Sequence, residues 1–399
     1  MPRKYSTYIV LSLIYFLFLG GIMMIVGQDS TLLKLAYLEN KMFKVKFDLT
    51  FYITLILYLV FIISMFVYFS WRLKKLKLTE LTWIKRGNRV SVFLGFLTIF
   101  ASIFIFRSFF QDFMTNGGSL YLATRFADPV TLKFFQILIR LSLAFSFLSF
   151  AYSKTGLDRV LSIFLIAVII GVCLLVGNRM ELLIYAIAVF FYFIYACNLR
   201  LKTWKTVVVV FGALVVFNII ESSRYLFTVE IETFSIYDIL LDFVNVFNML
   251  TSTETVASFI SLYGILYHDV RLTIFEVLNV LSFSSFDLPN AFDSYHYYSN
   301  KLNLLEGQGY SFNILSCFVM LFGPIIGVFS AIFFVIGVFE LLYEFICNLL
   351  KYNGFIMSYF LSINLLWGRM TYESSKVVLT EGILIPLFAF FIVKTIAKF

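Results

Sequence analysis

The chain has 399 residues, of which 61% are hydrophobic and 14% charged, with a mean hydropathy of +0.94. Water-soluble domains contain about 45–50% apolar and about 25% charged residues, which excludes a soluble enzyme, a disordered protein, a secreted disulfide scaffold and a nucleic-acid-binding domain. The net charge of +8 then indicates basic cytoplasmic loops rather than nucleic-acid binding. Composition therefore predicts an all-α integral membrane protein.

Ten apolar stretches predict about ten transmembrane helices, since a span needs about 20 apolar residues. They lie near residues 8–26, 49–70, 91–110, 132–152, 160–177, 181–198, 206–220, 324–346, 355–370 and 382–397. The first stretch follows Arg3 and Lys4 and resembles a signal peptide. No small-residue cleavage site follows it, so we interpret it as a retained helix.

Basic residues concentrate in alternate loops. If the N-terminus is inside, the inner loops and both terminal segments hold 17 of the 31 lysines and arginines. The same stretches, counted to the ends of the flanking helices, hold four acids: Glu80, Asp158, Glu340 and Glu344. The positive-inside rule therefore predicts that both termini lie in the cytoplasm.

The same assignment of spans and basic loops predicts one large outer loop, residues 221–308. It holds eleven acidic against three basic residues, and both histidines of the protein. Polar residues recur at helical spacing in 236–250, which predicts an amphipathic helix on the membrane surface. Two shorter helices are expected at 256–266 and 272–281. The chain thus divides into helices one to seven (1–220), the partly helical loop (221–308), and a short re-entrant helix with helices eight to ten (309–399).

Several arginines lie at or within the predicted membrane, where ionisable residues indicate function by default. Arg179 lies in a sharp turn after Gly177-Asn178, Arg224 follows Ser222-Ser223, and Arg369 ends the ninth span. Helix ends with free N–H groups suit phosphate binding there, although a structural role stays open for all three. Arg107 and Arg140 are expected to pair with a buried carboxylate or to reach the membrane edge.

Few side chains suit acid–base chemistry. His268 and His296 titrate near neutral pH without a shifted pKa, and Glu221 and Glu306 are the carboxylate alternatives. No zinc-ligand spacing, P-loop or Asp-x-Asp pair occurs, so we expect no metal and no cofactor. A plain surface role stays open for each histidine.

An aromatic cluster surrounds His296. Tyr295 and Tyr297 flank it, and Asp293 precedes it by three residues. Aromatic rings pack on the apolar faces of sugars and carboxylates bind sugar hydroxyls, which favours a sugar-binding role for these three residues. The alternative is a belt of interfacial tyrosines.

Three stretches carry a resemblance to a known family. They are Gly177 to Leu183, Glu221 to Tyr225, and Gly307 to Asn313, the last followed by Leu321-Phe322-Gly323-Pro324-Ile325-Ile326-Gly327. With ten spans and one large outer loop, the chain resembles the Wzy-type O-antigen or capsular repeat-unit polymerases. The topology similarity covers nearly the whole chain, and it implies a GT-C-like glycosyltransferase architecture in the bacterial inner membrane.

The resemblance implies a substrate, undecaprenyl-diphosphate-linked oligosaccharide repeat units, which are joined at the periplasmic face without a metal. Arg179, Arg224 and Arg369 would then bind diphosphate, and His296, or else His268 or Glu221, would accept the acceptor's proton. A polysaccharide chain-length regulator is a possible partner besides the lipid bilayer, and nucleic acid is not expected.

Two alternatives stay open. The related O-antigen ligases carry His-Asn ahead of the loop-end glycines, whereas this chain has Phe312-Asn313, which favours the polymerase. A transporter or flippase would need polar residues along a central path, but spans 8–26, 49–70 and 324–339 carry no charge.

Overall fold

The structure is a computed structural model and describes ten parts of the chain. They are residues 48–76, 78–82, 84–107, 111, 129–176, 179–197, 262, 314–350, 353–365 and 378–398. Within these ranges the chain is helical and forms no strand, apart from an isolated bridge between Thr79 and Asn353. The first and seventh predicted spans, the helices expected in the loop 221–308, and the three-part division of the chain lie wholly or largely outside these residues.

Five helices are long and apolar enough to cross a membrane. They are α3 (Leu49–Lys74), α4 (Gly87–Ile105), α7 (Pro129–Ala151), α8 (Gly156–Val176) and α15 (Pro324–Leu350). They correspond to the spans expected near 49–70, 91–110, 132–152, 160–177 and 324–346. The all-helical character predicted from composition is therefore confirmed for this part of the chain, which has five helices that could span a membrane.

Shorter helices correspond to the three other described spans. They are α9 (Arg179–Phe191) with the π-helical turn η1 (Tyr192–Ala196), α16 (Gly354–Asn364), and the π-helical turn η3 (Thr380–Leu384) with α18 (Ile385–Ile396). A ninth apolar helix, α14 (Ile314–Phe322), precedes α15. At 1.5 Å per residue, α16 rises about 16 Å, roughly half the hydrocarbon thickness, so it is shorter than the span expected at 355–370.

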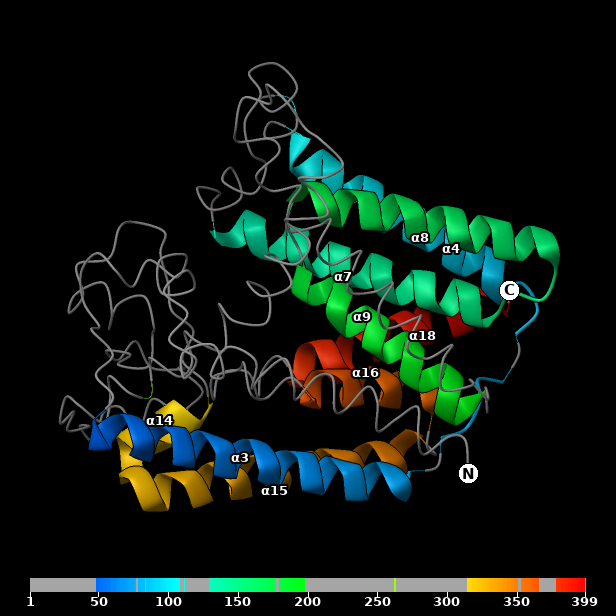
Figure 1. Cartoon of the computed structure of the whole chain (residues 1–399). Helices are drawn as coiled ribbons and strands as arrows, with labels where there is room; N and C mark the ends of the chain where they lie inside the picture. The colour runs from blue at the N-terminus through cyan, green and yellow to red at the C-terminus, as the bar shows by residue number, and fades with distance from the viewer. Residues whose placement is uncertain are drawn as a thin grey trace, which may run out of the picture.

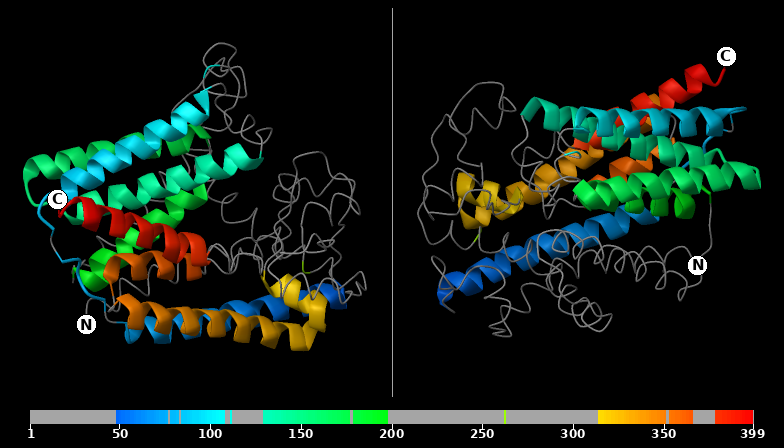
Figure 2. Two further views of the ribbon diagram at one scale, coloured as in Figure 1. Left: turned by 180° about the vertical axis from the view of Figure 1, so that it is seen from behind. Right: turned by 90° about the horizontal axis from the view of Figure 1, so that it is seen from above.

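The helices form two layers (Figure 1). In one layer α7 is central and contacts α4, α8, α9 and α18, while α16 packs against α9, η1 and η3. In the other layer α3 lies alongside α15, whose first turns pack on α14; the views in Figure 2 show the same arrangement. The rings of Phe339 in α15 and Phe360 in α16 stack at 5.1 Å and join the layers.

Some faces of these helices are apolar and exposed, and others are buried inside the bundle. α3 exposes Leu49, Tyr52, Ile56, Ile63 and Val67, which recur at helical spacing on one face. Such an apolar outer face is stable only where the surrounding solvent is lipid. By contrast, every residue of α16 is buried, so α16 lies inside the bundle.

Small residues let α4 approach its neighbours closely. The buried residues of α4 are Gly87, Asn88, Ser91, Val92, Gly95, Ile99 and Ser102. Helix pairs in membranes pack closely where such small side chains meet. At its first turn the Asn88 amide donates to the Ser149 carbonyl at 2.7 Å and to the Ser162 hydroxyl at 2.9 Å. One buried side chain therefore joins α4 to the end of α7 and the start of α8.

The segment 78–82, between α3 and α4, is tied to the same end of the bundle. The Gly354 amide donates to the Thr79 carbonyl at 3.0 Å, and the Leu81 amide donates to the Tyr192 hydroxyl at 3.3 Å. The Asn353 side chain caps α16 by accepting from the Phe355 amide at 3.1 Å. These bonds hold the starts of α16 and η1 against the segment that leaves α3.

A tight helical hairpin joins α14 to α15. Gly323 adopts a left-handed φ of 79°, Pro324 starts α15, and Gly327 lies against α14. A Cβ at Gly327 would lie 2.5 Å from the Val319 Cα, so no larger residue fits without moving backbone. Of the two glycines in this Phe-Gly-x-x-x-Gly stretch, Gly323 is thus explained by its left-handed backbone and Gly327 by close packing.

We expect Gly327→Ala to lower the free energy of unfolding by about 1–3 kcal/mol, because its methyl group would overlap the α14 backbone. The matched control is Gly337→Ala in the same helix, where an added Cβ meets no described atom within 4 Å. That control should be neutral or stabilising by about 0.5–1 kcal/mol. Thermal denaturation in detergent measures both, and equal stability of the two variants would contradict the packing argument.

Candidate functional site

One of the predicted site residues, Arg179, falls on the described backbone, although its side chain is not described. The others lie outside the described residues: Glu221, Arg224, His268, Asp293, Tyr295, His296, Tyr297 and Arg369. The candidate site is therefore built from Arg179 and the charged residues that surround the start of α9.

The turn that carries Arg179 is short. α8 ends at Val176 and α9 begins at Arg179, and the two helices pack against each other. The first amides of an α-helix have no partner within the helix, and the helix dipole makes this end positive. An arginine at the first helical position adds its charge to that end, which favours an anionic ligand.

A buried ion pair lies directly below this turn. Arg140, at the midpoint of α7, donates from Nη2 to the Oε1 atom of Glu181 in the first turn of α9 at 3.2 Å. The two side chains are 24% and 10% exposed. The expectation that Arg140 pairs with a buried carboxylate is confirmed, and its partner is the acid two residues after Arg179.

In the sequence, Glu181 belongs to the stretch Gly177 to Leu183, and no ion-pair partner was predicted for it. A signal was present, because Glu181, Tyr185 and Tyr192 lie four and seven residues apart and so share one face of α9 and of the turn η1 that follows it. The two tyrosines are buried. A polar stripe on an otherwise apolar helix indicates a face that meets other polar groups inside the bundle.

Polar contacts continue inward from the ion pair. The Ser146 hydroxyl of α7 lies 3.2 Å from the Tyr185 hydroxyl of α9, and both are buried. Tyr359 of the buried helix α16 packs beside Phe147 with ring centroids 5.7 Å apart. Inward from the ion pair, α7 and α9 thus share one buried polar contact, and α16 packs beside it through aromatic rings.

Arg140 neutralises Glu181, and this has a chemical consequence for Arg179. A carboxylate beside a helix N-terminus would otherwise compete with an anionic ligand for the nearest cation. With Glu181 already bonded to Arg140, the arginine of the turn is not required as its counter-ion. Among the described residues, no three His, Cys, Asp or Glu side chains gather as metal ligands.

Arg107 has a different environment. It lies exposed just beyond the C-cap of α4, and its guanidinium lies 5.0 Å from the ring centroid of Phe104. No ion pair of Arg107 with a carboxylate occurs in the described part of the chain. This geometry fits the alternative expectation, in which the long side chain reaches the membrane edge.

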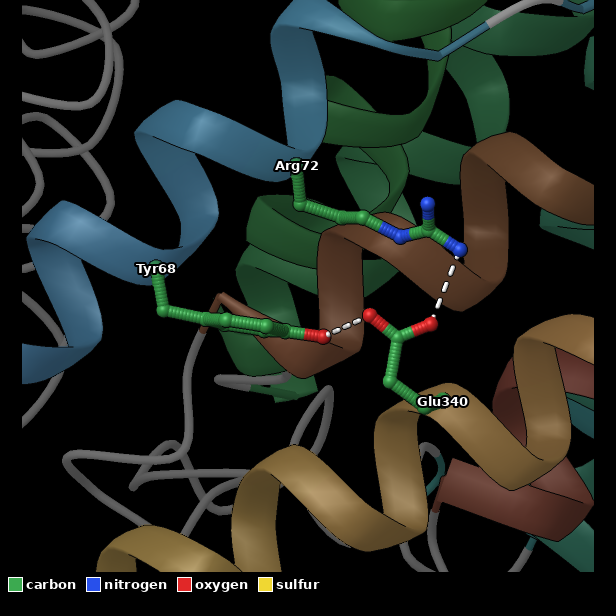
Figure 3. Close-up of polar contacts among 3 residues, drawn as sticks. All are labelled: Tyr68, Arg72 and Glu340. Atoms are coloured by element: carbon green, nitrogen blue, oxygen red, sulfur yellow. Dashed lines mark hydrogen bonds and ion pairs between the residues drawn. The ribbon is translucent and has the colours of Figure 1, made fainter.

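A second charged cluster joins α3 to α15, near the end of the bundle where segment 78–82 lies (Figure 3). Glu340 accepts from Arg72 Nη2 at 2.8 Å and from the Tyr68 hydroxyl at 2.6 Å. The Arg72 guanidinium also lies 3.9 Å from the ring centroid of Tyr343. Both carboxylate oxygens are bonded, so this cluster is a clamp between two helices that run in parallel.

Basic residues gather at that same end. This end lies at the right of Figure 1. Four helices end there, α3, α7, α15 and α18, and three begin there, α4, α8 and α16. We call it the basic end, and its described cations are Arg72, Lys74, Lys75, Lys85, Arg86, Arg89, Lys154, Arg159, Lys394 and Lys398. The turn before α9 and the start of α7 lie at the opposite end of the helices.

The cysteines with described side chains are Cys173, Cys197 and Cys347, and all three are free thiols. Cys173 and Cys347 are buried in α8 and α15, where they pack as small apolar groups.

Comparison of the chain with models of protein families, with curated proteins and with solved structures found no match.

A double-mutant cycle tests the buried pair. Arg140→Ala alone should destabilise the protein by about 3 kcal/mol, because it leaves the Glu181 carboxylate buried without its counter-ion. Adding Glu181→Gln should recover most of that loss. Thermal unfolding in detergent reports both values.

Arg159→Ala is the control for removing an arginine, since Arg159 is exposed near the start of α8. It should change stability by less than about 0.5 kcal/mol. Strictly additive losses in the Arg140 and Glu181 variants would show that the two side chains do not interact.

Proposed function

We propose that this chain is a bacterial inner-membrane glycosyltransferase. It polymerises undecaprenyl-diphosphate-linked oligosaccharide repeat units at the periplasmic face. The observation that carries the proposal is an arginine at the first position of α9, two residues before a carboxylate that another arginine already neutralises. This arrangement leaves a cationic helix end for an anionic group at the membrane surface.

Charge distribution supports the orientation. The bases that the positive-inside rule assigns to the cytoplasm gather at one end of the described helices. In the proposed topology both termini are cytoplasmic, ten helices span the membrane, and residues 221–308 form a periplasmic loop within a GT-C-like architecture. The turn carrying Arg179 then faces the periplasm, where the lipid-linked units are displayed.

The proposed reaction is a glycosyl transfer between two lipid carriers. A terminal hydroxyl of the acceptor unit attacks the anomeric carbon of the donor glycan, and the bond between that carbon and the diphosphate oxygen breaks. Arg179, with Arg224 and Arg369, stabilises the negative charge on the departing undecaprenyl diphosphate. The growing glycan is thereby moved onto the incoming unit.

The outer loop supplies the remaining roles in this proposal. His296, or else His268 or Glu221, accepts the proton of the attacking hydroxyl. Asp293, Tyr295 and Tyr297 bind the sugar. Since the diphosphate is an already activated leaving group, proton transfer is the smaller demand on the site, and charge stabilisation by the arginines is the larger one.

Reconstitution with a purified lipid-linked repeat unit tests the proposal. The protein in liposomes should convert single units into a ladder of longer glycans. Arg179→Ala and Arg224→Ala should each lower the rate by about 100-fold or more, as expected when one charge-stabilising group is lost. His296→Ala should also lower the rate if that residue is the base.

Arg159→Ala is the matched control for these variants, because it removes an exposed arginine at the basic end. It should retain the ladder. Transfer of glycan to lipid A without lengthening would replace the proposal by a ligase, and movement of intact lipid-linked units across the bilayer without lengthening would replace it by a flippase.

Orientation has its own test. In a cysteine-free background, Lys154→Cys marks the basic end and Leu49→Cys marks the opposite end; both positions are exposed. A membrane-impermeant maleimide added to spheroplasts should label position 49 and spare position 154 until the membrane is permeabilised. The reverse pattern would put the basic end outside and overturn the proposed topology.

A further inference from the structure

A hollow at the basic end lies between the start of α4 and the end of α18. Its volume is about 290 Å³, and it is lined by Arg86, Arg89, Val90, Phe93, Leu94 and Ile396. It lies at the opposite end of the bundle from Arg179, so nothing in the proposed glycosyl transfer uses it.

The polar half of the hollow is cationic. Arg86 and Arg89 are both exposed, and no acidic residue lines the hollow. Arg86 is the N-cap of α4 and adopts a left-handed φ of 71°, with no side-chain hydrogen bond to the first turn. Glycine or asparagine would adopt this backbone conformation with less strain.

The other half of the hollow is apolar and faces outward. Phe93 is 66% exposed and Ile396 is 47% exposed. In a helix that crosses a membrane, such side chains contact acyl chains. The hollow therefore combines two exposed cationic side chains with an exposed apolar surface. Lys394 and Lys398 of α18 are also exposed and add positive charge beside it.

We propose that this hollow binds an anionic phospholipid of the surrounding leaflet. The guanidinium groups of Arg86 and Arg89 bind the headgroup phosphate, and Phe93, Leu94 and Ile396 hold the first part of an acyl chain. Charge complementarity selects an anionic headgroup, because arginines clustered beside membrane helices attract anionic lipids. The apolar half selects a lipid over free phosphate. This inference does not depend on the proposed function.

Native mass spectrometry of the delipidated protein tests the site. When each lipid is added back to the delipidated protein, phosphatidylglycerol should stay bound and phosphatidylcholine of the same chain length should dissociate. Arg86→Asn, which tolerates the left-handed backbone, and Arg89→Gln should each weaken phosphatidylglycerol binding by about fivefold, since one basic residue at a membrane surface contributes that much. Phe93→Ala should weaken it while leaving the preference between headgroups unchanged.

Arg159→Gln is the matched control. It removes an exposed arginine at the same end, outside the hollow, and should leave phosphatidylglycerol binding unchanged. Unaltered binding in both Arg86→Asn and Arg89→Gln, or equal retention of the two lipids, would overturn the proposal. Displacement of the lipid by millimolar inorganic phosphate would also overturn it, because the site would then be one for a free anion.

Discussion

A charge inside hydrocarbon costs about 3 kcal/mol or more unless it is paired, and this cost governs how the helices of the chain associate. Arg140 and Glu181 join α7 to α9, and Arg72 and Glu340 join α3 to α15. Lipid gives apolar helices no hydrophobic reason to associate with one another, so such pairs select which helices become neighbours. Each layer of the structure contains one of these pairs.

Polar bonds are distributed unevenly between the two ends. At the basic end Asn88 joins three helices, and backbone bonds tie segment 78–82 to α16 and η1. At the opposite end the turn before α9 is supported from below by the Arg140–Glu181 pair. Among the described residues, the basic end is thus held by bonds between several helices, and the opposite end by one ion pair between α7 and α9.

Hydropathy could predict the existence of the long helices, because about 20 consecutive apolar residues have few alternatives to spanning a bilayer. It could not predict which helices pair, since Arg140 and Glu181 are separated by 41 positions and Arg72 and Glu340 by 268.

Hydropathy also could not predict the length of α16. The side chains of Ser358, Ser362 and Asn364 donate hydrogen bonds to carbonyls of their own helix. The whole helix is buried inside the bundle, and no local sequence pattern reveals that burial. The sequence could predict that Arg179 lies next to a turn, because Gly177-Asn178 marks one locally. It could not predict that the counter-ion of Glu181 is Arg140 from another helix.

The two proposed sites are linked through α7. α4 and α18 both contact this helix, and α7 carries Arg140 at its midpoint. A lipid that bridges α4 and α18 at the basic end would hold the two helices that flank α7 without touching Arg140. Because a buried ion pair depends on close geometry to offset its desolvation, restraint of α7 would favour the Arg140–Glu181 contact. The turn that carries Arg179 would then be held more rigidly in an anionic leaflet than in a neutral one.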